Sequence, residues 1–119
     1  MGFVHVKVAV AGLAASAPSR DVELLVDTGA LFSMLPASIL ESLGVARSEK
    51  MEFETAGGQV ITREVGYAWF RHNGRKALSP VIFGEESDKS LLGVVTLETL
   101  RMEVDPVRNE IRPVRGKLY

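Results

Sequence analysis

Apolar and polar residues alternate along much of this chain, a pattern typical of β-strands that bury one face. The segment Gly2–Ala11 is mostly β-branched and apolar, with polar side chains at positions 5 and 7. A second apolar run covers Asp21–Val26, and residues 12–20 between the two runs are rich in Ala, Ser and Pro. Because such a segment favours a turn, we expect these two runs to form a β-hairpin.

Glycine-containing turns predict two further hairpins in the middle of the chain. Residues 51–55 alternate between apolar and polar, Gly57-Gly58 interrupts the pattern, and Val60–Phe70 resumes it. A second turn, at Asn73-Gly74, leads into the next strand at residues 77–83. Both dipeptides suit the tight turns that join antiparallel strands.

Two short helices and a closing hairpin complete the prediction. The segment Pro36–Leu43 begins with proline, which suits a first helical position, and ends before Gly44, a typical stop. A short apolar strand at residues 90–93 leads into a second helix, Val94–Arg101. The last two strands are predicted around a turn at Asp105-Pro106, over residues 102–104 and 109–114. The chain is therefore predicted to be mainly β, with residues 1–119 forming a single domain.

Composition narrows the class of protein. With 119 residues, 46% of them hydrophobic, the chain is large enough to bury its own core. It has no cysteine, which excludes disulfides and thiolate metal sites and favours a cytoplasmic location. A formal net charge of -1 and the absence of a long apolar run predict neither a nucleic-acid nor a membrane partner. His5 and His72 have no acid at ligand spacing, so we predict no metal site and no cofactor.

The candidate chemistry lies at Asp27-Thr28-Gly29-Ala30, which ends the second apolar strand and precedes an extended apolar segment, 31–35. A carboxylate at the end of a buried strand costs free energy unless it is paired or hydrogen-bonded. The hydroxyl of Thr28 can bond locally, and Gly29 permits a tight turn that aims the carboxylate outward. From this tetrapeptide alone, an Asx-type turn without catalytic function remains an equal alternative. A phosphotransferase of the haloacid dehalogenase type is disfavoured, because Gly29 stands where its second acid is needed.

Three segments of the chain, taken in order, resemble the retropepsin-like aspartic proteases. They are the apolar strand with Asp27-Thr28-Gly29-Ala30, the glycine-rich hairpin at Gly57-Gly58, and Leu91-Leu92-Gly93 before a helix. The resemblance covers nearly the whole chain, and its ending, down to Pro113, is most similar to the prokaryotic and cellular branch of that family. It implies a closed, barrel-like acid protease fold with two short helices and one lobe per chain.

The resemblance also implies a mechanism and a homodimer. Aspartic protease chemistry needs two carboxylates that share a proton and hold a water, and this sequence offers one Asp-Thr-Gly. Asp27 of each subunit would supply one carboxylate, Thr28 would bond the partner's loop, and the Gly29 carbonyl would meet a peptide or unfolded protein substrate. The other substrate-binding residues that the resemblance implies are Ala30 and, at the tip of a flap, Ala56, Gly57, Gly58 and Gln59.

Two departures from the viral members of that family concern substrate recognition. Where they carry acidic residues and an arginine, this chain has Leu31, Phe32 and Val94. The acid that would pair with the arginine is thus lost together with it. An alternative function on the same fold is a non-catalytic dimer that binds peptides or supports assembly, with Asp27 in a structural role.

Overall fold

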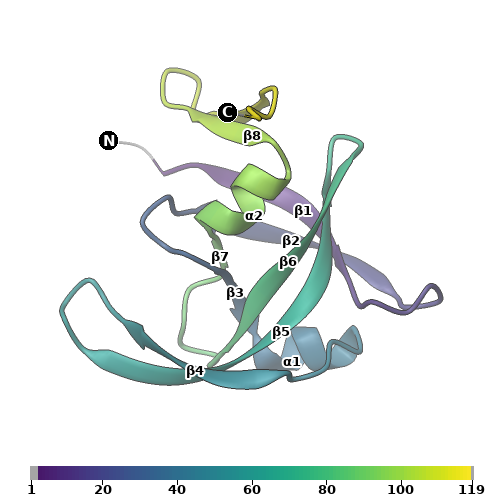
Figure 1. Cartoon of the computed structure of the whole chain (residues 1–119), viewed down its shortest axis with the longest axis vertical. Helices are drawn as coiled ribbons and strands as arrows, with labels where there is room; N and C mark the ends of the chain where they lie inside the picture. The colour runs from purple at the N-terminus through teal and green to yellow at the C-terminus, as the bar shows by residue number, and fades with distance from the viewer. Residues whose placement is uncertain (1–2, 119) are drawn as a thin grey trace.

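The first two strands form the predicted hairpin. The computed structural model describes residues 3–118 and places β1 at His5–Ala11 and β2 at Ser19–Val26, paired antiparallel with Val8 opposite Val22 (Figure 1). Along β1, the even-numbered valines point into the core while alternate positions face outward. The alternation seen in the sequence therefore sets which face is buried. Gly2, where the first strand was predicted to begin, lies outside the described residues.

The larger sheet has seven strands and closes on itself. Its order is β1-β2-β7-β3-β6-β5-β4, and β1 pairs additionally with β5. The strands not yet placed are β3 (Ser33–Pro36), β4 (Glu49–Glu54), β5 (Val60–His72), β6 (Arg75–Gly84) and β7 (Leu91–Leu92). Because β1 meets both β2 and β5, the sheet curls into a barrel-like body around one core. The predicted mainly β, closed architecture is confirmed.

The core is built mainly from aliphatic side chains of nearly every strand, together with the rings of Phe70 and Phe83. Phe70 of β5 is fully buried among them. Other fully buried apolar residues of the same cluster come from β1, β2, β3, β6, β7, α1 and the C-cap of α2, and they include Val8, Val10, Leu24, Leu35, Leu40, Val81, Leu92 and Leu100. Burial on this scale is the main favourable term that holds the barrel together.

Both predicted helices form, each shorter than expected. α1 covers Ala37–Ser42, because Pro36 is the last residue of β3 and serves as the helix cap. Gly44 follows the helix with a φ of 75°, the left-handed conformation that suits a glycine stop. α2 covers Val94–Thr99 and packs against β6 and β8. Its predicted end at Arg101 was wrong because Arg101 has a positive φ of 56°.

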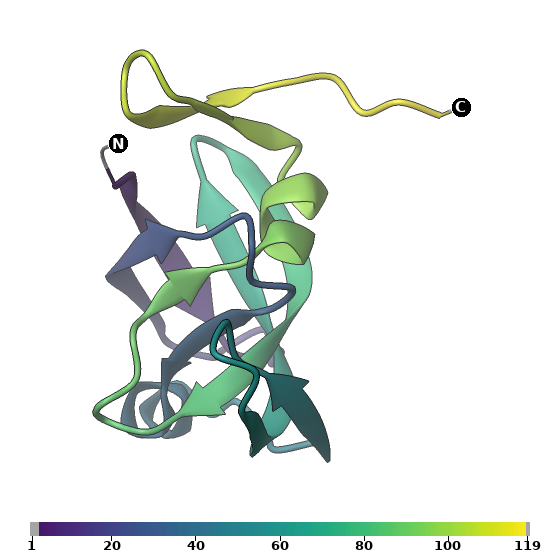
Figure 2. The ribbon, with the colours of Figure 1, turned by 90° about the vertical axis from the view of Figure 1, so that its left-hand side faces the viewer.

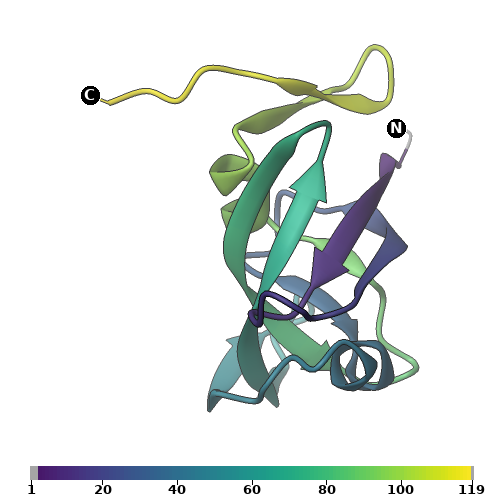
Figure 3. The same ribbon diagram turned by 90° about the vertical axis from the view of Figure 1, so that its right-hand side faces the viewer.

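A separate two-stranded sheet of β8 (Met102–Asp105) and β9 (Glu110–Pro113) follows α2. The turn between them is fixed by the Asp105 carboxylate, whose Oδ1 accepts the backbone N–H groups of Val107 and Arg108. Arg112 of β9 donates hydrogen bonds to the Glu103 carboxylate of β8, and this interaction raises the pKa of Arg112, which joins the two strands as a cation. Figures 2 and 3 show this hairpin at one end of the molecule and the β4–β5 hairpin at the other.

Two strand boundaries differ from the sequence prediction in a way that matters for the site. The extended segment predicted over 31–35 begins as a strand only at Ser33, and Leu31 and Phe32 belong to the preceding loop. The reason is that the Leu31 carbonyl accepts a hydrogen bond from the N–H of Val95 at the start of α2. The strand chemistry predicted over Val60–Phe70 and on to Arg71 forms one uninterrupted β5 that ends at His72.

Candidate active site

The loop of residues 27–32 joins β2 to β3 by passing over the end of β7, which lies between those two strands in the sheet. Backbone hydrogen bonds fix it at both ends. The N–H of Asp27 donates to the Leu92 carbonyl at 3.0 Å, and the N–H of Val94 donates to the Ala30 carbonyl at 2.8 Å. We call residues 27–32 the active-site loop. Its backbone is held by the segment that the sequence predicted as its support.

The carboxylate of Asp27 is half-buried and held within this loop. Its Oδ1 accepts the backbone N–H of Gly29 at 2.9 Å, and its own carbonyl accepts the N–H of Ala30 at 3.1 Å. This is the Asx-type turn that the sequence allowed. The hydrogen bond within the turn is made by Oδ1, and the side chain of Asp27 lies in the wall of a cleft. This geometry is compatible with both alternatives from the sequence analysis: a turn without catalytic function, and a loop that holds a carboxylate toward a substrate.

A network of three buried hydroxyl groups lies under the active-site loop. The sequence analysis did not predict this network. Thr96 of α2 contacts the hydroxyl of Ser33 at 2.5 Å and that of Ser79 at 2.7 Å, and the Ser33 hydroxyl accepts the N–H of Gly93 at 3.0 Å. All three side chains are fully buried. The sequence signal that could have revealed the network is a polar residue within an otherwise apolar strand or helix segment. A hydroxyl group at such a position needs a hydrogen-bond partner inside the core.

Gly93 is required by a close approach of two backbones. A Cβ at this position would overlap the carbonyl group of Phe32 and lie 2.8 Å from the backbone nitrogen of Ser33. The start of α2 therefore packs directly on the active-site loop. This contact explains why a glycine follows Leu91-Leu92.

The flap hairpin, which we define as β4, β5 and the turn 55–59 between them, faces the active-site loop. The turn is closed by the N–H of Thr55, which donates to the Gln59 carbonyl at 2.8 Å. Gly58 has a φ of 83°, whereas Gly57 has no positive φ and a Cβ there would lie at ordinary contact distance, 3.9 Å, from Oγ1 of Thr55. The turn therefore requires a glycine at position 58 and not at position 57. Phe53 of this hairpin meets Phe32 of the loop edge to face, with ring centroids 6.0 Å apart.

A cleft of about 540 Å³ opens between the active-site loop and the flap hairpin. Of the predicted site residues, Asp27, Gly29, Ala30 and Ala56 line it, while Thr28, Gly57, Gly58 and Gln59 do not line it in the single chain. The remaining lining residues are mostly apolar and were not predicted: Leu31, Phe32, Met34, Phe53, Ile61, Ile82 and Leu91, with Glu52, Glu54, Thr55 and Arg63. The structure therefore brings the acid and one flap-tip residue into a common, largely apolar cleft.

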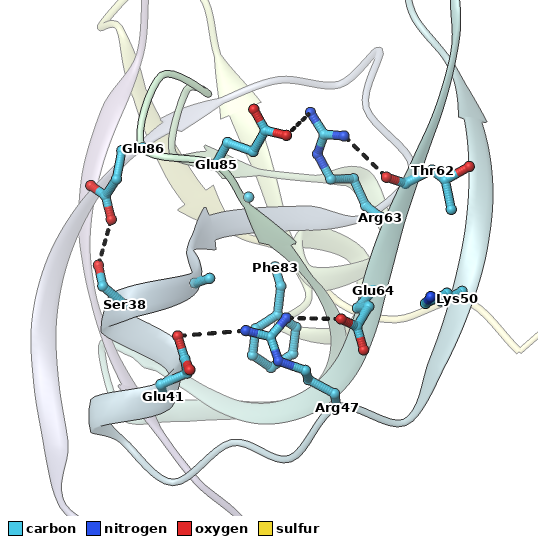
Figure 4. A pocket seen from close by; sticks show the side chains of 12 residues that line it. Ser38, Glu41, Arg47, Lys50, Thr62, Arg63, Glu64, Phe83, Glu85 and Glu86 are labelled. Atoms are coloured by element: carbon cyan, nitrogen blue, oxygen red, sulfur yellow. Dashed lines mark hydrogen bonds and ion pairs between the residues drawn. The ribbon is translucent and has the colours of Figure 1, made fainter.

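A second hollow of about 630 Å³ lies beside α1, on the other side of Arg63 (Figure 4). Arg47 sits there over the ring of Phe83, 4.4 Å from its centroid, and pairs with Glu41 and Glu64. Arg63 pairs with Asp88 at 3.3 Å and with Glu85 at 3.7 Å. Both arginines that line this second hollow are therefore already paired with acidic side chains. The ion pairs of Arg63 connect the base of the flap hairpin to the loop of residues 85–90.

Residues 3–118 contain no group of three or more His, Asp or Glu side chains placed to hold a metal ion. Within the same residues, no helix is both long and apolar enough to cross a membrane.

Comparison with known families decides what kind of protein carries this loop and cleft. A sequence profile described as "Aspartyl protease" matches residues 6–96, which include the active-site loop, the flap hairpin and the start of α2. The chain belongs to the aspartyl protease family. A comparison with curated proteins found no match.

Solved structures place this aspartyl protease in the retropepsin-like fold. EIAV protease complexed with the inhibitor HBY-793 matches with a TM-score of 0.62 and 19% sequence identity, over 83% of this chain and 88% of that one. At this identity the likeness concerns the fold. The recognition of a retropepsin-like aspartic protease from three short segments is confirmed, and its prokaryotic branch stays a prediction.

Proposed function

We propose that this aspartyl protease is a homodimeric endopeptidase that hydrolyses peptide bonds with two Asp27 carboxylates, one from each subunit. The observation that carries the proposal is the position of Asp27: its Oδ1 is held by the Gly29 N–H while the side chain lines an open cleft under the flap hairpin. A carboxylate held at one oxygen within its own loop, with its side chain in the wall of a cleft, is arranged to face a partner.

The homodimer follows from the chemistry. Two carboxylates about 3 Å apart cannot both ionise cheaply, so they share one proton, and the pair can then act as base and acid together. The sequence contains one Asp-Thr-Gly. A second carboxylate must therefore come from a second copy, related by a two-fold axis that passes beside the active-site loop. The solved relative with a bound inhibitor is consistent with a peptide-binding cleft.

The residues of the loop then take distinct roles. The ionised Asp27 takes a proton from the water that attacks the scissile carbonyl, and the protonated Asp27 donates its proton to the carbonyl oxygen. The proton taken from the water then passes to the leaving amine as the C–N bond breaks, and the other carboxylate recovers its proton as the carbonyl re-forms. Thr28 is exposed and bonds the partner's loop, which keeps the two carboxylates coplanar. The carbonyl of Gly29 accepts a hydrogen bond from the substrate backbone.

The flap hairpin closes over the bound peptide. β4 is the last strand in the sheet order, and its tip residues Ala56, Gly57, Gly58 and Gln59 are exposed. Backbone groups at such a tip bind an extended peptide by strand addition, and closure excludes water from the reacting bond. Ala56 already lines the cleft of the single chain, and in this proposal Gly57, Gly58 and Gln59 reach the substrate when the flap moves.

The test is cleavage of an unstructured protein by purified protein, followed by mass spectrometry. Asp27→Asn should abolish cleavage, whereas Asp21→Asn, a matched change at an exposed position of β2, should leave it intact. Specific activity should also rise with protein concentration until the dimer saturates. A folded, dimeric wild type that cleaves nothing supports the alternative, a non-catalytic peptide-binding module.

Three further expectations stay predictions. A single domain over residues 1–119 is consistent with the closed barrel and the helix that packs on it. The cytoplasmic location rests on the lack of cysteine. A role without nucleic acid or membrane rests on the small net charge and the apolar pattern of the chain.

A further inference from the structure

Two cations lie directly opposite each other on the outer face of the β5–β6 ladder. Arg71 of β5 is the register partner of Lys76 of β6, and both side chains are exposed. Among the residues that the structure describes, neither makes an ion pair with an acidic side chain. Because like charges at opposite positions of a sheet repel each other, this pair costs free energy in the isolated chain. An anion bound between the two cations would remove that cost.

The turn between β5 and β6 offers room for an anion beside this pair. A hollow of about 250 Å³ lies there and is lined by residues 71–76. Arg75 is already engaged, because its guanidinium donates to backbone carbonyls that follow α2 and β9. Lys7 of β1 adds positive charge next to the turn: its side chain is exposed, and its carbonyl oxygen lies 3.1 Å from Nδ1 of His72. The end of the ladder is therefore basic, with a hollow of its own.

The same face of the ladder continues as an apolar strip. Side chains that are directly opposite or two residues apart share a face, so Trp69 with Leu78, and Tyr67 with Pro80, extend the row of the two cations. Leu78 is 48% exposed and Tyr67 is 39% exposed, and none of the four belongs to the buried core cluster. Nζ of Lys76 lies 5.2 Å from the centroid of the Trp69 ring, which holds that cation beside the aromatic surface. We call these six residues the β5–β6 strip: Tyr67, Trp69, Arg71, Lys76, Leu78 and Pro80.

The charges around the strip favour an acidic peptide over a nucleic acid. Asp21 and Glu23 of β2 are exposed and lie opposite Ala9 and Lys7 of β1, and Ala9 in turn lies opposite Arg71. These acids therefore share the outer face of the sheet with the cations. They would repel a phosphate backbone that extends beyond the cations, and the net charge of the chain is -1. A peptide brings carboxylates for the basic end and apolar side chains for the rest of the strip.

We propose that the β5–β6 strip is a docking surface for an extended acidic segment of a partner protein. Carboxylates of that segment lie between Arg71 and Lys76, and its apolar side chains pack on Trp69 and Leu78. None of the strip residues lines the cleft beside Asp27, so the interaction does not depend on the proposed catalysis. Between positions 67 and 71 the strand rises by about 13 Å, which matches a segment of about five extended residues.

The experiment measures binding of a fluorescein-labelled peptide, four glutamates followed by leucine, proline and leucine, to the full chain by fluorescence anisotropy. The same peptide with glutamine in place of every glutamate should bind to the wild type at least about 5-fold more weakly, because its ion pairs are lost. Arg71→Gln/Lys76→Gln should weaken binding of the acidic peptide by about 5-fold for the same reason. Trp69→Leu keeps an apolar side chain but loses the aromatic face, and it should weaken binding by about 3-fold.

Two further variants control for net charge and for binding in the cleft. Lys89→Gln/Arg108→Gln makes the same change in net charge at two exposed positions outside the strip, and it should leave peptide binding unchanged. Leu31→Ser alters the cleft, and it should also leave peptide binding unchanged. Thermal melting identifies variants that do not fold, and the comparison of the two peptides on wild-type protein carries the test if Arg71→Gln/Lys76→Gln is one of them.

The outcomes separate the inference from the proposed function. Equal binding of the two peptides by the wild type, or equal losses in Arg71→Gln/Lys76→Gln and its charge-matched control, overturns the inference. A loss of binding in Leu31→Ser alone puts the peptide in the cleft and also overturns it. Tighter binding of a labelled oligothymidine, dependent on Arg71 and Lys76, identifies a nucleic-acid surface instead. Acidic-peptide binding through the strip, in a wild type that cleaves no protein, supports the inference and overturns only the proposed catalysis.

Discussion

The hydroxyl groups of Ser33 and Thr96 lie 2.5 Å apart beneath the active-site loop, although 63 positions separate them in the chain. Thr96 also contacts Ser79, so one hydroxyl of α2 joins β3 and β6. Within residues 3–118 no buried side-chain nitrogen or oxygen lacks a hydrogen-bond partner. This network ties the helix that supports the active-site loop to the barrel.

Thr96→Val should therefore destabilise the protein. The methyl group fills the space of the hydroxyl, but Ser33 and Ser79 each lose a buried partner, at a cost of about 1 to 3 kcal/mol in the free energy of unfolding. Urea unfolding measures the difference. Thr99→Val on the exposed side of the same helix is the matched control and should change the free energy of unfolding by about 0.5 kcal/mol or less. Equal effects of the two substitutions would contradict a role for the network.

The turn of the flap hairpin allows a comparison of two adjacent glycines. Gly58→Ala should destabilise the turn by about 1 kcal/mol, because its φ of 83° is costly for a residue with a Cβ. Gly57→Ala should be tolerated, since the new Cβ would lie 3.9 Å from the nearest atom, Oγ1 of Thr55. Peptide turnover and thermal melting of both variants provide the measurement. A larger loss for Gly57→Ala would mean that the turn is different when substrate is bound.

Arg63 provides a test of how the flap hairpin is fastened. Its side chain is 17% exposed and pairs with Asp88, itself 23% exposed, and with the more exposed Glu85. Arg63→Gln should lower the free energy of unfolding by about 1 kcal/mol and raise KM, because the base of the flap loses its link to the loop of residues 85–90. Arg112→Gln, which removes an exposed ion pair of the β8–β9 hairpin, should leave KM unchanged. A KM that responds to both substitutions alike would argue against a specific link to the flap.

The pH profile of activity should depend on Ala30. A serine at this position, next to the turn that holds Asp27, would add a hydroxyl donor that stabilises an ionised carboxylate. The pair of carboxylates would then lose its shared proton at a lower pH. The alkaline limb of kcat/KM against pH should therefore move to lower pH in Ala30→Ser. Dimer content is checked at each pH. An unmoved limb, or one moved to higher pH, would contradict the hydrogen-bond argument without affecting the family assignment.

Much of the fold could be predicted from the sequence because its signals are local. Alternation in Gly2–Ala11 and the turns at Gly57-Gly58 and Asn73-Gly74 identify hairpins, in which neighbours in sequence pair in space. Asp27 and its support at Leu91-Leu92-Gly93 were found because three segments occur in a recognisable order.

The rest of the site could not be predicted because it depends on contacts between distant segments. The hydroxyl network joins Ser33 and Thr96, and the cleft joins Phe32 to Phe53. The pattern of a single sequence does not show which residues from distant segments come into contact. A pair of glycines likewise does not show which of them has the positive φ, and in this turn it is Gly58.

The most direct test of the account mixes two forms of the protein. Wild type is equilibrated with an equal amount of Asp27→Asn protein, above the concentration at which dimers form, and cleavage is followed over time. Mixed dimers hold one carboxylate, so random exchange should reduce the cleavage rate of a fixed amount of wild type to about half. The same amount of added Asp21→Asn protein should raise the rate instead, because those dimers keep both carboxylates. A rate unchanged by Asp27→Asn protein would show that each chain acts alone and would contradict the shared Asp27 pair.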